Sequence, residues 1–171
     1  IFVKLLSRFP NSIQTSTSEY WLSVSKLYLQ KYQEAIKGFR SYLIDHPTEI
    51  YADQCNYQIG LCYFGMEDYT SAKSEFTKSI ELYPTSSIYA EACSLKGDIF
   101  ASAGNLEEAI HFYDLAYQGS KNINQANYAL FQKCEVMFVE QQFTNILSDI
   151  DQYVSDWKHL IDLVKITVWR G

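Results

Sequence analysis

One stretch of the chain decides its fold: residues 51–84, which read YADQCNYQIGLCYFGMEDYTSAKSEFTKSIELYP. The spacing of its apolar residues predicts a helix over about 51–65 and a second over about 69–82, with a short turn between them. Pro84 ends the second helix because proline cannot continue a helix interior. One face of that helix carries three residues at four-residue steps: Ala72, Phe76 and Ile80.

The same order of residues returns every 37 positions along the chain. The closing proline stands at Pro10, Pro47 and Pro84. The large residue eight positions earlier is Phe2, Phe39, Phe76, Tyr113 and then Ile150. The small residue before it is Ala35, Ala72 and Ala109, then Ile146. A fixed period that carries large, small and stop residues is the mark of a repeat array.

This register predicts four two-helix repeats and two partial ones in a single domain of residues 1–171. The full repeats cover about 16–47, 51–84, 88–121 and 124–157, and the partial ones cover 1–10 and 158–171. Gly60 and Gly97 give the small residue that two closely crossing helices need, and the large residues fill the space between neighbouring helix pairs. One helical hairpin cannot bury both of its faces, so stacking is required for stability. Because both ends fall inside repeats, we expect a piece of a longer array.

The residue set resembles the tetratricopeptide repeat, whose order it follows through Gly60, Tyr63, Tyr69, Ala72, Phe76 and Pro84. The resemblance implies an all-α fold, a right-handed α-solenoid of tetratricopeptide-like helix-turn-helix repeats. The usual period of that family is about 34. The longer period, together with strings such as Tyr83-Pro84-Thr85-Ser86, is similar to that of bacterial cell-envelope proteins. These include the Tol–Pal-associated periplasmic coordinator and the outer-membrane assembly lipoprotein.

The resemblance also implies that the first helices of the repeats line a concave groove that binds a peptide or protein segment. The expected groove residues are Tyr20, Val24 and Tyr28; then Gln54, Tyr57, Leu61 and Phe64; then Glu91, Ser94, Asp98 and Ser102; then Tyr128, Phe131, Glu135 and Phe138. Such a groove is aromatic and slightly acidic, and rigid aromatic residues are common anchors in recognition. Aromatic residues at helical spacing are more often core than contact, so both interpretations stay open.

Composition excludes several classes of function. A net charge of -6 and a pI near 5.0 argue against binding of nucleic acid, which needs a basic stripe. The three histidines are far apart in a linear array, and no nucleophile elbow, phosphate loop or dinucleotide fingerprint is present. We therefore expect no catalytic residues, metal, cofactor or small-molecule substrate. The chain has no apolar run that approaches the roughly 18 residues of a membrane span.

The four cysteines favour a reducing compartment, whereas the length of the repeat favours the periplasm, so the location stays open. None of the four forms a CxxC pair or a zinc spacing, and we expect them to be reduced core residues: Cys55, Cys62, Cys93 and Cys134. Two functions of different kinds remain. The first is a non-catalytic scaffold that binds a protein partner. The second is a structural module that assembles with itself through open repeat faces.

Overall fold

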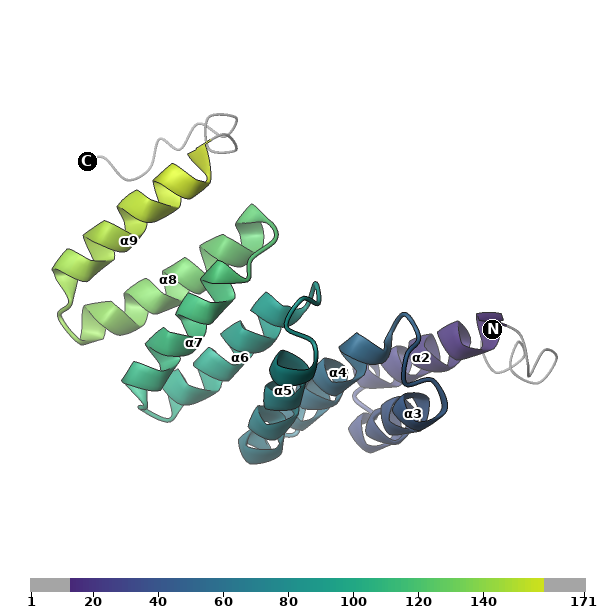
Figure 1. Cartoon of the computed structure of the whole chain (residues 1–171). Coiled ribbons are helices and arrows are strands. Elements are labelled where there is room, and N and C mark those ends of the chain that lie inside the picture. Colours follow the sequence, from purple (N-terminus) through teal and green to yellow (C-terminus); the bar gives the residue numbers. More distant parts are fainter. Residues whose placement is uncertain (1–12, 159–171) are drawn as a thin grey trace. The chain divides into compact units, whose positions relative to one another are not determined.

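A computed structural model describes residues 13–158, and within that range the chain forms helices and no strand. The helices are α2 (Ile13–Tyr28), α3 (Tyr32–Asp45), α4 (Ala52–Gly65), α5 (Tyr69–Leu82), α6 (Tyr89–Ser102), α7 (Leu106–Gln118), α8 (Ile123–Val139) and α9 (Phe143–Asp156) (Figure 1). The predicted all-α fold of helix-turn-helix repeats is confirmed. The partial repeats predicted at 1–10 and beyond residue 158 lie outside the described residues.

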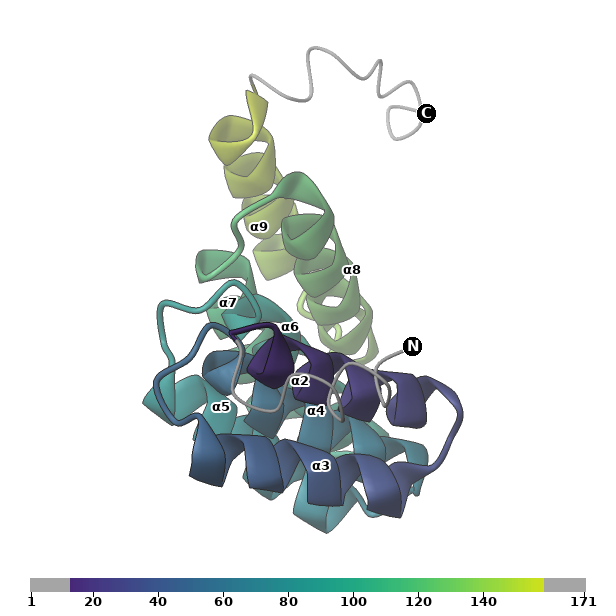
Figure 2. The same cartoon turned by 90° about the vertical axis from the view of Figure 1, so that its right-hand side faces the viewer.

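Successive helices pack in pairs, as α2 with α3, α4 with α5, and α8 with α9. Gly97 of α6 likewise lies against the ring of Tyr113 in α7. The chain divides into two compact units, of which the first ends at Ala92 and the second begins at Cys93. In the first unit α3 packs against both α2 and α4 (Figure 2), and α4 packs against α5. In the second unit α8 packs against α7 and α9. A single continuous right-handed solenoid stays a prediction.

Small residues let the two helices of a repeat approach closely, as the register predicts. A Cβ atom added at Gly60 of α4 would lie 2.5 Å from the ring of Phe76 in α5. A Cβ atom added at Gly97 of α6 would lie 2.7 Å from the ring of Tyr113 in α7. Both rings are fully buried, so neither glycine has room for a larger side chain.

The turn inside each repeat has a left-handed residue that recurs with the period of the array. The backbone angle φ is 59° at Gln30, 61° at Glu67, 77° at Gly104 and 58° at Gln141. Each of these residues is followed by an amide that bonds back to a carbonyl five positions earlier, as Asp68 N does to Tyr63 O at 3.0 Å. This closure satisfies a free carbonyl at the end of the first helix. Of these four residues only Gly104 lacks a side chain, so only it adopts a positive φ without a steric cost.

Each unit has its own core. In the first, buried residues of three helices meet around Phe39, including Tyr20 of α2 and Cys55 of α4. In the second, Tyr113 of α7 packs with Val136 of α8. The register residues Phe39 and Tyr113 thus lie in the cores, together with residues such as Tyr20 that the register did not single out.

Candidate partner-binding faces

The first helix of the last repeat carries an exposed aromatic face. Tyr128, Phe131 and Phe138 of α8 are 45%, 59% and 65% exposed. Their spacing of three and seven residues puts them along one side of the helix. We call these three residues the aromatic stripe. The exposed Glu135 follows Phe131 by four residues and precedes Phe138 by three, so it lies on the same side of the helix. The other side of α8 is buried through Ala126, Ala129, Val136 and Met137.

A shared carboxylate fixes one end of the aromatic stripe. The hydroxyl of Tyr128 donates to Asp98 Oδ2 at 2.8 Å, and the hydroxyl of Tyr113 donates to Asp98 Oδ1 at 2.8 Å. Burial, and then the bond to Asp98, raise the pKa of Tyr128 to about 12. The Asp98 carboxylate therefore has internal partners for both of its oxygens, and it holds the Tyr128 hydroxyl in place.

The other end of the aromatic stripe rests on the following helix. The ring of Phe138 meets Phe143 of α9 edge-on, with centroids 5.5 Å apart and planes at 72°. The same contact joins Phe64 and Tyr69 in the second repeat, 74 positions earlier, at 5.5 Å and 73°. Such edge contacts are favourable and orient both rings. Two of the three stripe residues are thus held in place by contacts inside the unit.

The first unit presents a related face on α2 and α4. Tyr28 is 83% exposed, while Tyr57, Leu61 and Phe64 are half-buried. The Tyr57 ring packs against Phe76 with centroids 5.9 Å apart. Burial raises the pKa of Tyr57 to about 12, and the nearby Glu91 and Tyr28 add to the effect. The face therefore combines the exposed ring of Tyr28 with the half-buried side chains of Tyr57, Leu61 and Phe64.

Two residues expected to line the groove are instead core residues of the first unit. Tyr20 is 1% exposed and stacks on Tyr51 with ring centroids 4.2 Å apart, and Val24 is 5% exposed. The Tyr20 hydroxyl donates to Gln54 Oε1 at 2.8 Å and accepts from Gln58 Nε2 at 3.2 Å. Helical spacing alone did not reveal this burial, because it depends on which neighbouring helix covers the face.

An exposed aromatic residue of the first helix α2 was missed. Trp21 follows Tyr20 directly and is 42% exposed, with its ring edge-on to those of Tyr20 and Tyr51 at 5.4 and 5.9 Å. The residue 37 positions later is Gln58, so the repeat pattern gave no signal for an aromatic residue at this place.

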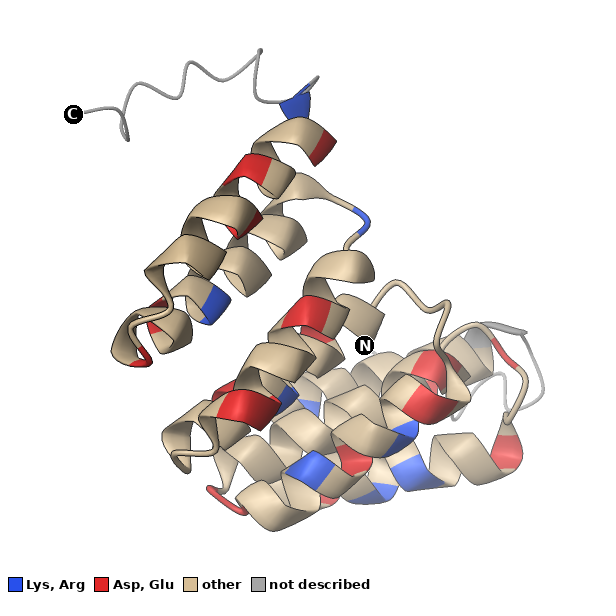
Figure 3. Cartoon of the chain, turned by 60° about the vertical axis from the view of Figure 1, so that its left-hand side comes forward, with Lys and Arg blue, Asp and Glu red and all other residues tan. Residues whose placement is uncertain are grey.

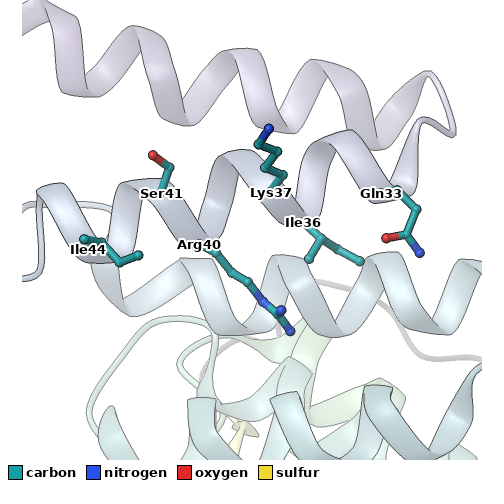
Figure 4. Close-up of a pocket in the computed structure, with 6 residues that line it drawn as sticks. All are labelled: Gln33, Ile36, Lys37, Arg40, Ser41 and Ile44. Carbon is teal, nitrogen blue, oxygen red and sulfur yellow. The ribbon is translucent and has the colours of Figure 1, made fainter.

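Positions of both charge signs are interspersed along the described helices (Figure 3). A shallow hollow on α3 is lined by Gln33, Ile36, Lys37, Arg40, Ser41 and Ile44 (Figure 4). Its Arg40 guanidinium is directed to Tyr63 Oη at 3.2 Å and to Glu75 at 3.8 Å. In the second unit, Lys133 lies 2.6 Å from Asp114 and 2.7 Å from Asp149. Burial lowers the pKa of Lys133, but the two carboxylates outweigh burial and raise it.

No group of three or more His, Cys, Asp or Glu side chains among residues 13–158 is arranged to hold a metal ion. Within the same range, no helix is both long and apolar enough to cross a lipid bilayer. The four cysteines are free thiols, and burial raises the pKa of Cys55 and of Cys62 to about 12.

Known structures share this arrangement of helices. BtubC (BKLC) from P. vanneervenii has a TM-score of 0.73 at 9% identity, over 99% of this chain and 74% of that one. A crystal structure of MamA protein gives 0.67 at 14% identity, over 99% and 85%. A CopN–Scc3 complex gives 0.57 at 15% identity, over 78% and 74%. Comparison with curated proteins finds no significant match.

Residues 53–86 and 90–120 match the family model of the tetratricopeptide repeat. Repeats of this family are generally non-catalytic modules that bind other proteins, which supports a role in protein–protein interaction. The low identities to the solved structures bear on the fold alone. These two segments are thus similar to the tetratricopeptide repeat, and the chain has an all-α fold of helix-turn-helix repeats like that of the solved structures.

Proposed function

We propose that the protein is a non-catalytic scaffold that captures a segment of a partner protein on the exposed faces of its first helices. The observation that carries the proposal is the aromatic stripe of α8, whose three rings are 45–65% exposed. Isolated exposed apolar residues are ordinary, but a row of rings on one helix face is typical of a binding surface. The face of Tyr28, Tyr57, Leu61 and Phe64 gives the first unit a second surface of the same kind.

The chemistry of the stripe favours a partner segment with apolar side chains and a positive charge. Tyr128 and Phe131 offer ring faces, and aromatic faces attract Arg and Lys as well as apolar groups. Glu135 adds an exposed carboxylate beside them, and the chain as a whole carries a net charge of -6. Opposite charges at an interface mainly speed association and select partners. Binding is therefore expected to weaken as salt is raised.

The test uses peptides selected from a random display library against the wild-type chain, with dissociation constants measured by fluorescence anisotropy. Phe131→Ala is expected to weaken binding by about 2 kcal/mol, roughly thirtyfold, as for a central aromatic anchor. The matched control is Leu82→Ala, a residue of α5 that is 62% exposed and lies outside both faces. Peptides that bind Phe131→Ala as tightly as the wild type would show that the stripe is not the binding surface.

A setting in the bacterial cell envelope is part of the proposal and rests on the 37-residue period. The flanking sequence of the full-length gene product tests it. A signal peptide with a lipid-attachment cysteine would support the envelope, and a chain that continues into cytoplasmic domains would contradict it.

A second candidate function is self-assembly, and the observation in its favour is an exposed apolar face on α9. Phe143, Leu147, Ile150 and Val154 of this helix are 41–64% exposed. Light scattering across a wide range of concentrations separates the two functions. A size that falls on dilution would favour assembly, and a constant monomer mass would exclude it for this chain.

A further inference from the structure

The aromatic stripe and Glu135 together follow the spacing of a coiled-coil seam along α8. Steps of three, four and three residues join them in turn: Tyr128, Phe131, Glu135 and Phe138. The first and last stand ten residues apart, which is roughly 15 Å along the helix axis. Alternating steps of three and four residues let one helix pack along another over several turns. This side of α8 is therefore patterned to receive a second helix.

The stripe offers few hydrogen-bonding groups, and this favours a helical partner over an extended one. The hydroxyl of Tyr128 already donates to Asp98, and the side chains of Phe131 and Phe138 have no polar atoms. An extended segment would bury backbone groups that this surface cannot pair, whereas a helix pairs them internally. Side chains on one face of an extended segment are also roughly 6.6 Å apart. The steps along the stripe are shorter, roughly 4.5 and 6 Å.

The carboxylate of Glu135 selects the residue that a partner helix places against it. Glu135 is exposed, and the one basic residue of α8 is Lys133. Lys133 lies about 200° round the helix from Glu135 and is engaged by Asp114 and Asp149 at 2.6 and 2.7 Å. An apolar side chain over Glu135 would remove its carboxylate from water without a partner, at a cost in free energy. A Lys or Arg at that place in the partner removes this cost.

We propose that the aromatic stripe binds an amphipathic helix of about three turns, whose apolar residues recur at alternating steps of three and four. One Lys or Arg of that helix faces Glu135. The assignment rests on the proposed function, because it requires the aromatic stripe to be the surface that captures a partner segment. It adds the conformation of the segment and the place of its charge, as in recognition of a helix by its apolar face.

Charge argues against α9 of a second copy as the occupant. The exposed face of α9 has similar spacing, since Phe143, Leu147 and Ile150 stand four and three residues apart. The sequence of α9, FTNILSDIDQYVSD, contains three Asp and no Lys or Arg. A second copy would therefore bring charge of the same sign to Glu135, which is unfavourable at an interface. The partner is a basic amphipathic segment of another protein.

Three synthetic peptides of about two heptads test the proposal against the full-length chain. The first has leucine at the alternating steps and lysine at one central step, the second has glutamate in place of that lysine, and the third is the first with proline at a central, outward-facing position. Fluorescence anisotropy measures the dissociation constants, and circular dichroism measures the helix gained on binding. The lysine peptide is expected to become helical on binding. The glutamate and proline peptides are expected to bind at least about tenfold more weakly.

A charge reversal in the protein identifies the contact. Glu135→Lys is expected to exchange the preference, so that the glutamate peptide binds more tightly than the lysine peptide. The matched control Glu140→Lys makes the same change of charge at an exposed residue just after α8, and is expected to keep the wild-type preference. An unchanged preference in Glu135→Lys would overturn the proposal. A proline peptide that binds the wild type as tightly as the lysine peptide would also overturn it.

Peptides selected from the random library distinguish failure of this proposal from failure of the proposed function. Selected peptides that require Phe131 but gain no helix on binding would overturn the helical partner and leave the proposed function in place. Selected peptides that bind Phe131→Ala as tightly as the wild type would overturn both, because the aromatic stripe would then not be the binding surface.

Discussion

Replacing Gly60 by alanine is expected to destabilise the first unit by about 2 kcal/mol. The added Cβ would lie 2.5, 2.6 and 3.1 Å from three atoms of the Phe76 ring. Phe76 is 0% exposed, so its ring has no open space into which it can turn. Overpacking of this kind costs up to about 3 kcal/mol, and the better helix propensity of alanine offsets about 1 kcal/mol.

Urea unfolding followed by far-ultraviolet circular dichroism measures the effect, as a lower midpoint with an unchanged slope. A double-mutant cycle with Phe76→Leu identifies the cause, because leucine leaves room for the added methyl group. The cost of Gly60→Ala is expected to fall by at least about 1 kcal/mol in the Phe76→Leu background. If Gly60→Ala is as stable as the wild type, or if its cost is the same in both backgrounds, the close-contact argument is refuted.

Three further predictions concern the turn, the tyrosines and the thiols. Gly104→Ala is expected to lower the free energy of unfolding by about 1 kcal/mol in thermal melts, because φ at Gly104 is 77°. The backbone angle φ at Glu67 is 61°, so Glu67→Gly is expected to stabilise the protein or to leave its melting temperature unchanged. Because the folded state raises the pKa of Tyr57, its neutral hydroxyl contributes to the free energy of unfolding, fully below about pH 10 and less as the pH rises towards about 12. Alkaline titration followed by circular dichroism measures this loss of stability. Tyr57→Phe is expected to remove the part of the loss that comes from this hydroxyl. Iodoacetamide at pH 8 is expected to label the half-buried Cys134 before the buried Cys55, as mass spectrometry of the native protein would show; equal rates would contradict the buried positions.

Much of the fold was predictable because the information is local and repeated. The helix ends, the turn between them and the close approach at Gly60 all depend on residues within one repeat, and the period shows them several times over. The left-handed turn residues also follow the period, but only at Gly104 does the residue type indicate this conformation. At Gln30 and Glu67 the conformation accompanies the hydrogen bond of the next amide that ends the helix, and the residue type does not predict it.

The candidate binding faces were only partly predictable, because helical spacing gives a face without saying what covers it. Tyr20 and Tyr57 stand 37 positions apart at the same place in their repeats, yet one is 1% exposed and the other is half-buried beside a freely exposed Tyr28. The difference lies in local neighbours, since Tyr51 and Gln58 close over Tyr20.

The sequence by itself determined the repeat, its period and the order of large and small residues that makes the helices pack in pairs. Only the tertiary structure decided which aromatic residues are core and which carboxylate is held by two tyrosines. The physical reason is that periodicity records how one helix is patterned, whereas burial depends on contacts between residues far apart in the chain. The exposure of the α8 rings is a result of those distant contacts, and we expect the function to lie on that face.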